Sequence, residues 1–246
     1  MESAGRFFEI DLFRGIAILM MILFHTVFDL RFFRIMSIDV SSGFWWYFAL
    51  ATASLFLLIT GVSLTISYSR AAQQLSGFAL TKKFLLRGVF IFACGLLVTL
   101  VTYLYLGTGF VVFGILHLIG VSIMLSVLFF RFRGWNILAG VVVIVTGIFC
   151  AGVTGPLWLL PLGIHPAGFF SVDYTPLFPW FGMVLIGMGA GSLLYPSGVR
   201  RWGVPPLPQG AVQPLVFLGR HSLLVYLLHQ PVILLLLAAV TGTKIL

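Results

Sequence analysis

The first long apolar segment carries four ionisable side chains whose spacing suits proton transfer and anion binding. They are Asp11, Arg14, His25 and Asp29. On an α-helix, Arg14 and His25 lie about three turns apart on one face, roughly 16 Å from each other. Asp29 lies one turn beyond His25, and Asp11 lies one turn before Arg14. The spacing therefore predicts one polar stripe with an acid–base pair at each end.

Two hypotheses account for this stripe, because an ionisable side chain inside a membrane is costly and needs a structural or chemical reason. In the catalytic hypothesis His25 accepts a proton, Asp29 fixes its tautomer and raises its basicity, and Arg14 binds an anion at the inner end. In the structural hypothesis Asp11–Arg14 and Asp29–His25 are two pairs that hold helices together, with Arg14 reaching the interface. The spacing is compatible with both.

Other polar residues fall at membrane depth or at the ends of apolar segments. His117 stands in FGILHLIG, and His229 stands in YLLHQP beside Pro231, which removes a backbone donor and opens the helix. An opened helix usually faces protein or water. Because His117 lies at a depth similar to that of His25, His117 and His229 are candidates to line one cavity with His25. Each is also compatible with a hydrogen bond between helices. Asp173, in DYTPLFPWFG, either caps the next helix or contacts an acceptor at the outer mouth.

The composition excludes a soluble protein and several kinds of site. Hydrophobic residues make up 61% of the chain and charged residues only 8%, whereas soluble domains average about 25% charged. The net charge of +8 comes from basic residues in short loops, so no nucleic-acid partner is expected. Cys94 and Cys150 lie in apolar segments and are predicted to be buried thiols. No zinc signature, P-loop or GxSxG occurs, and no metal is predicted.

Apolar segments near the length that spans a bilayer, about 20 residues, recur along the chain. The predicted spans are residues 11–30, 44–68, 86–106, 109–129, 134–153, 178–195 and 218–241. Residues 156–164 are too short to span and are expected at the interface or as a re-entrant segment. Residues 196–214 are predicted to be a Pro-rich loop, and Gly187 and Gly191 to be close-packing positions. The sequence predicts an all-α integral membrane protein, a bundle of about seven transmembrane helices in a single domain over 1–246.

The distribution of Lys and Arg predicts the orientation, because cytoplasmic loops are enriched in positive charge. With the N-terminus inside, the inner segments hold Arg6, Arg14, Arg70, Lys82, Lys83, Arg87, Arg131, Arg133, Arg200, Arg201 and Arg220. The outer segments hold Arg31, Arg34 and Lys244. We therefore expect a multi-pass cell-membrane protein with a cytoplasmic N-terminus and a C-terminus outside.

Arg14, ten further residues and His25 resemble the R-x10-H motif of the transmembrane acyltransferase superfamily. Three more blocks, FGILHLIGVSIML, DYTPLFPWFGMVLIGMGAG and LGRHSLLVYLLHQPVI, are similar to the bacterial and archaeal branch related to heparan-α-glucosaminide N-acetyltransferase. The resemblance runs from about residue 7 to 236. Arg14 and His25 match the motif pair, and His117, Asp173 and His229 match blocks typical of the branch.

The resemblance implies an enzyme that moves an acyl group, such as acetyl, from cytoplasmic acyl-CoA to a carbohydrate-like or lipid-linked acceptor on the outer side. His25 and Asp29 would be catalytic, Arg14 would bind the donor, and His117, Asp173 and His229 would serve the cavity or the acceptor. His117 is also a candidate to steady the oxyanion. Acyl-CoA is the expected co-substrate, membrane lipid the expected surrounding, and a homo-oligomer is left open.

The chain departs from the glucosaminide enzymes at the first helix. Those enzymes carry Asn where His25 stands and place their catalytic His later, at the position of Met36. Glucosaminide itself is therefore not the assumed acceptor. Two other functions stay open: a proton-coupled transporter that uses the same polar residues, and a haem protein with His117 and His229 as ligands.

Overall fold

The computed structural model describes residues 6–203 and 209–242, and it is all-helical over that part of the chain. Its α-helices are α1 (Phe8–Phe32), α2 (Gly43–Ala71), α3 (Gly77–Leu106), α4 (Ile115–Phe129), α5 (Asn136–Cys150), α6 (Leu177–Leu194), α7 (Gln209–Arg220) and α8 (Ser222–Thr241). Three 3-10 helices connect them: η1 (Phe130–Trp135), η2 (Leu157–Leu162) and η3 (Pro196–Gly198). The predicted fold class is confirmed.

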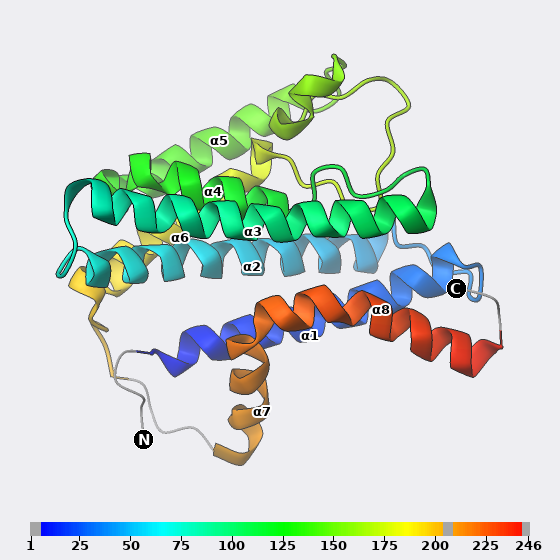
Figure 1. Cartoon of the computed structure of the whole chain (residues 1–246), viewed down its shortest axis with the longest axis horizontal. Helices are drawn as coiled ribbons and strands as arrows, with labels where there is room; N and C mark the ends of the chain where they lie inside the picture. The colour runs from blue at the N-terminus through cyan, green and yellow to red at the C-terminus, as the bar shows by residue number, and fades with distance from the viewer. Residues whose placement is uncertain (1–5, 204–208, 243–246) are drawn as a thin grey trace. The chain divides into compact units, whose positions relative to one another are not determined.

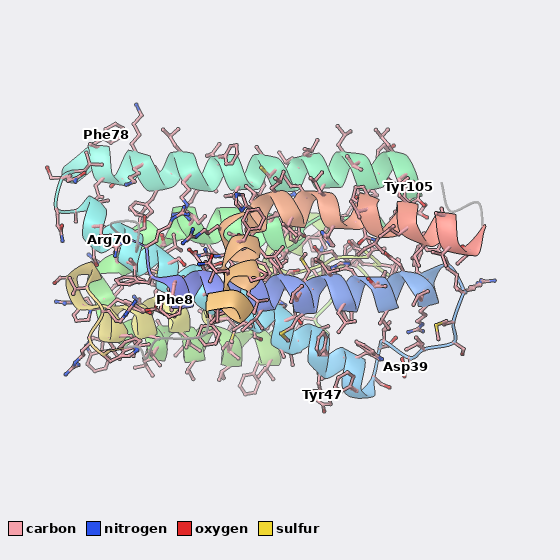
Figure 2. All side chains as sticks on the ribbon, turned by 90° about the horizontal axis from the view of Figure 1, so that it is seen from below. Phe8, Asp39, Tyr47, Arg70, Phe78 and Tyr105 are labelled. Atoms are coloured by element: carbon pink, nitrogen blue, oxygen red, sulfur yellow. The ribbon has the colours of Figure 1, made fainter. Side chains whose placement is uncertain are left out.

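Six helical segments of the described chain are long and apolar enough to cross a membrane. They are α1, α2, α3, the segment Ile115–Cys150, α6 and α8. Large apolar side chains point outward from these helices, as at Leu104, Phe149 and Val240, which are 74%, 81% and 83% exposed. In Figure 2 the outward side chains of α3, between Phe78 and Tyr105, are mainly hydrocarbon. The chain is a multi-pass membrane protein whose apolar surface suits lipid.

The segment Ile115–Cys150 contains two helices rather than one rod. α4 and α5 are joined at one end by η1, where Arg133 has a φ of 48° (Figure 1). Gly147 packs on Pro179 and Gly140 packs on Gly182, so α5 runs antiparallel to α6. Each of the two helices has 15 residues, which is about 22 Å of helix.

α4 runs in the same direction as α6. Phe113, just before α4, forms a parallel bridge with Tyr174, just before α6, and Phe129, the last residue of α4, packs against Phe181 of α6. The chain therefore reverses at η1, and α4 and α5 are two antiparallel helices; whether each crosses the membrane, as the spans 109–129 and 134–153 predict, stays a prediction.

The chain divides into two compact units, and α2 runs from the first into the second. Unit 1 is Met1–Phe56 with Pro205–Leu246, and unit 2 is Leu57–Val204. In unit 1, α7 and α8 both pack against α1, and α7 crosses α1 steeply (Figure 1). A Cβ built on Gly219 would lie 1.8 Å from the Asp11 carbonyl oxygen, and one on Gly15 would lie 2.0 Å from that of Leu215. Only glycine allows this approach of the two backbones.

Unit 2 is held together by further close backbone contacts and by an apolar core. Gly187 packs on Leu58, and Gly191 packs on Val62, so the predicted close-packing role of both glycines is confirmed. Small residues serve this purpose because lipid supplies no hydrophobic force between helices. The core residues include Leu57, Leu64, Phe84, Leu118, Leu185 and Met188.

Three predicted helix starts are wrong, those of the third, fourth and seventh spans. The third span, predicted at 86–106, begins at Gly77, because the long stems of Lys82 and Lys83 let a helix continue past its apolar part. The fourth, predicted at 109–129, begins at Ile115 after a turn that contains Gly109 at φ +71°.

The segment predicted as span 218–241 is broken at His221 into α7 and α8. α7 also contradicts the predicted loop over 196–214, since it begins at Gln209 and accommodates Pro214. The short apolar segment 156–164 contains η2 and no helix long enough to span, as predicted. Cys94 and Cys150 are free thiols, but they are half-buried rather than buried as predicted. A single domain over 1–246 stays a prediction.

The reversal at η1 predicts that the two ends of the chain lie on opposite sides of the membrane. We expect a fluorescent protein fused before Met1 to fluoresce in the cytoplasm and a phosphatase fused after Leu246 to be active outside it. Paired reporters at both ends, in cells, make the measurement. Both ends on one side would mean that Ile115–Cys150 crosses once.

Candidate functional site in the helices of unit 1

Two imidazole rings meet in unit 1. His25 on α1 and His229 on α8 lie edge to face, with ring centroids 4.9 Å apart and planes at 74°. Phe24 packs on His25, and Tyr226 packs on His229. His229 is 8% exposed. The structure thus brings together two of the three histidines that the sequence predicts to line one cavity.

The backbone determines the tautomer of His229. Its Nδ1 lies 2.5 Å from the carbonyl oxygen of Tyr226. A carbonyl accepts and never donates, so Nδ1 carries the hydrogen and, in the neutral ring, Nε2 carries the lone pair. Nε2 is buried and has no hydrogen-bond partner in the described part of the protein. His229 is therefore oriented to accept a proton at Nε2.

Asp29 is bound by an amide and not by the neighbouring imidazole. Both of its carboxylate oxygens lie 2.8 Å from Nε2 of Gln230, which donates to them. Among the described residues no hydrogen bond joins Asp29 to His25, although their spacing predicts one. Asp29 is 2% exposed, and such a carboxylate needs a donor. α8 supplies that donor from the residue next to His229.

Gln230 is a site residue that the sequence reasoning did not assign. Its Nε2 serves Asp29, while its Oε1 is buried and has no partner in the described part of the protein. The signal was the pair His229–Gln230 before Pro231, but its partner on α1 is 201 positions away. Gln230 Oε1 and His229 Nε2 are two unpaired acceptors on adjacent residues.

A charged cluster forms at the other end of α1. Arg14 donates to Asp11 at 2.9 Å, which confirms the predicted contact, and also to the Gly219 carbonyl at 3.5 Å. Arg220 donates to the second oxygen of Asp11 at 3.4 Å. One carboxylate thus faces two guanidinium groups. The role of Arg220 was missed, since α7 was not predicted.

In unit 2, both ring nitrogens of His117 have partners. The Gly114 N–H donates to Nδ1 at 3.2 Å, so the neutral ring carries its hydrogen on Nε2, which faces the Thr99 hydroxyl at 3.3 Å. The ring is 1% exposed and stacks on Phe113. His117 closes the first turn of α4, and neither nitrogen is free to bind haem iron.

Asp173 caps α4 and not α6, the next helix along the chain, whose cap was one of the two roles predicted for it. Its Oδ2 accepts from the Ile115 N–H at 3.1 Å, and its Oδ1 accepts from the Thr175 hydroxyl at 2.8 Å. A carboxylate is favourable at a helix N-terminus. Burial raises the pKa of Asp173 above its ordinary value, and the hydrogen bonds from Thr175 and Ile115 lower the pKa in part. His117 and Asp173 are thus both engaged in closing α4.

Residues 6–231 match the model of a protein family, heparan-alpha-glucosaminide N-acetyltransferase, catalytic. The chain belongs to this family. The match covers the charged cluster of Arg14, the His25–His229 pair, Gln230 and the α4 cap. No curated protein and no solved structure matches the chain. Family membership indicates a membrane acetyltransferase and acyl-group chemistry.

Asp173 predicts a pH dependence of stability. Its folded-state pKa is raised, so its contribution to the free energy of unfolding is fully present below the ordinary value of 3.8 and is lost as the pH rises through the raised pKa. We expect Asp173→Asn, which cannot ionise, to remove this decrease. Each kcal/mol corresponds to about 2–4 °C in a chain of this size.

Thermal unfolding in detergent, measured from pH 4 to 8 for both proteins, makes this comparison. The melting temperature of the wild type should fall relative to that of Asp173→Asn as the pH rises. A constant difference across the range would contradict the raised pKa of Asp173.

Proposed function

We propose that the protein is a membrane-embedded acyltransferase that moves an acyl group, such as acetyl, from acyl-CoA to a hydroxyl or amine of a carbohydrate-like or lipid-linked acceptor. Family membership supports the acyl chemistry. The observation that supports the location is the His25–His229 pair, which has an unpaired, buried Nε2 on His229. A proton acceptor of this kind is what acyl transfer to a hydroxyl or amine requires.

In the proposed reaction the pair accepts the proton of the acceptor. As the acceptor oxygen or nitrogen attacks the thioester carbonyl carbon, its proton passes to His229 Nε2. The carbon–sulfur bond then breaks, and the imidazolium returns the proton to the departing thiolate. His25, against this ring, stabilises the imidazolium or takes the proton itself. A covalent acyl-histidine on His25 is the other route, and trapping a labelled acyl-protein would distinguish it.

Asp29 and Gln230 have positioning roles in this proposal. The Asp29 carboxylate holds the Gln230 amide, which leaves Gln230 Oε1 as an acceptor beside His229. A hydroxyl or amine of the molecule that receives the acyl group would donate the hydrogen bond that Gln230 Oε1 lacks. The negative charge of Asp29 also favours an imidazolium on the neighbouring turn of α1.

Donor binding by Arg14 remains part of the proposal. Arg14 and Arg220 share the Asp11 carboxylate, so positive charge exceeds negative charge among these three side chains. Guanidinium groups bind phosphate well, and the donor carries phosphates. The bias of basic residues supports a cytoplasmic N-terminus, with this end of α1 facing the donor and the C-terminus outside in a cell membrane.

A proton-coupled transporter is the alternative, since the same two histidines could relay protons. It predicts movement of an unmodified solute into vesicles, whereas the acyltransferase predicts a new ester or amide.

Removal of either histidine should lower turnover while the protein stays folded. We expect His25→Ala and His229→Ala each to lose at least about 100-fold, which is the usual contribution of a general base. The double variant should lose little more, because residues that act together fail together. Turnover per folded molecule, measured with acetyl-CoA for the singles and the double, tests this.

His221→Ala is the matched control, because His221 is exposed and, among the described residues, its side chain contacts its own helix turn at Phe217. It should keep its activity. Full activity in a folded His25→Ala, His229→Ala double variant would refute the proposed site.

A further inference from the structure

Unit 2 contains a half-open pocket of about 420 Å³ at the end where α2 and α6 terminate. Its walls come from the last turns of α2, from η1, and from the residues that follow α6. The polar lining residues are Thr65, Tyr68, Ser69, Gln73, Arg131, Arg133, Asn136, Ser192, Tyr195 and Ser197. Two guanidinium groups, several hydroxyls and no carboxylate therefore surround the space. Its volume lies in the range of small-molecule sites.

The basic charge at this end of unit 2 has little acidic charge to balance it. Residues 57–204 contain eight basic residues, namely Arg70, Lys82, Lys83, Arg87, Arg131, Arg133, Arg200 and Arg201. The single acidic residue in that range is Asp173. Asp173 caps the start of α4, whereas Arg131 and Arg133 follow its end. In Figure 2 Arg70 and Phe78 lie at one end of unit 2 and Tyr105 at the other.

A buried acceptor in the pocket wall lacks a donor. Asn136 is 1% exposed, and its Nδ2 donates to the Phe129 carbonyl at 3.0 Å. Its Oδ1 has no hydrogen-bond partner in the described part of the chain. A buried acceptor without a donor is destabilising. A ligand that supplies a hydroxyl, amine or amide N–H would remove that cost.

The walls of the pocket are braced by contacts of their own. The Tyr68 and Phe130 rings stack with centroids 3.9 Å apart, and Arg131 lies over the Phe132 ring at 4.9 Å. Gln73 donates to the Ser197 carbonyl at 3.4 Å and so ties α2 to η3. Arg131 and Arg133 therefore belong to η1, a helical turn that packs on α2 through Phe130.

We propose that this pocket binds the phosphate of an organic phosphate that also carries hydrogen-bond donors. Arg131 and Arg133 hold the phosphate, and Asn136 Oδ1 accepts from the organic part. Two sources have this chemistry: the nucleotide end of an acyl-CoA donor and the headgroup of an anionic phospholipid. The first source rests on the proposed function, and the second does not.

The test uses the full-length protein in detergent and two probes, adenosine 3′,5′-bisphosphate and a short-chain phosphatidylglycerol. The variant combines Arg131→Gln with Arg133→Gln. Because contacts between guanidinium and phosphate are charge-assisted hydrogen bonds, its affinity for the bound probe should fall at least about tenfold. The matched control combines Lys82→Gln with Lys83→Gln, which removes the same charge from the same end but outside the pocket. It should stay within about twofold of the wild type.

Arginine-dependent binding of the bisphosphate supports a nucleotide source, and arginine-dependent binding of the lipid supports a headgroup source. Failure of both probes to bind, or equal losses in the arginine and lysine variants, would overturn the proposal. If the protein cleaves no thioester yet binds either probe through the two arginines, the proposed function fails and this site stands.

Discussion

The Asp29–Gln230 contact is the constraint on which the arrangement of unit 1 depends. In a membrane segment a buried carboxylate has no water to bind, so it must find a donor on another helix. Gln230 supplies that donor and thereby fixes the register of α8 against α1. Because His229 is the next residue, the same contact fixes where its ring meets His25. At the opposite end of α1, Asp11 accepts a hydrogen bond from Arg220, which joins α7 to α1.

Local features were predictable from the sequence, and distant partners were not. Asp11 and Arg14 stand one helical turn apart, so their contact follows from helix geometry alone. The donor to Asp29 lies on a helix far along the chain, and nothing near Asp29 indicates it. His117 was predicted as a cavity residue because a membrane histidine is unusual. In the structure its two ring nitrogens form hydrogen bonds with a backbone amide and with a hydroxyl. α7 was not predicted because a proline such as Pro214 is typical of a loop. The close packing of α7 on α1 at Gly219 and Gly15 stabilises the helix despite this proline.

The buried polar groups differ in whether the protein itself supplies their hydrogen-bond partners. In unit 2 the polar groups at one end, His117 and Asp173, are satisfied within the protein and close a helix. Among the described residues four buried side-chain atoms have no hydrogen-bond partner: His229 Nε2, Gln230 Oε1, Asn136 Oδ1 and, on α4, Ser122 Oγ. Native proteins pair nearly all buried polar atoms. The two proposals place a substrate or ligand group at the first three of these atoms and give no such role to Ser122 Oγ.

In the proposed function this chain breaks a thioester and transfers its acyl group. The most direct measurement follows labelled acetyl-CoA with the purified protein in liposomes, together with a panel of amino sugars and lipid-linked sugars. We expect protein-dependent release of free CoA and appearance of the label in one acceptor or on the protein. If folded protein releases CoA no faster than protein-free liposomes, and the label stays on CoA with every acceptor, the protein is not an acyltransferase for acetyl-CoA.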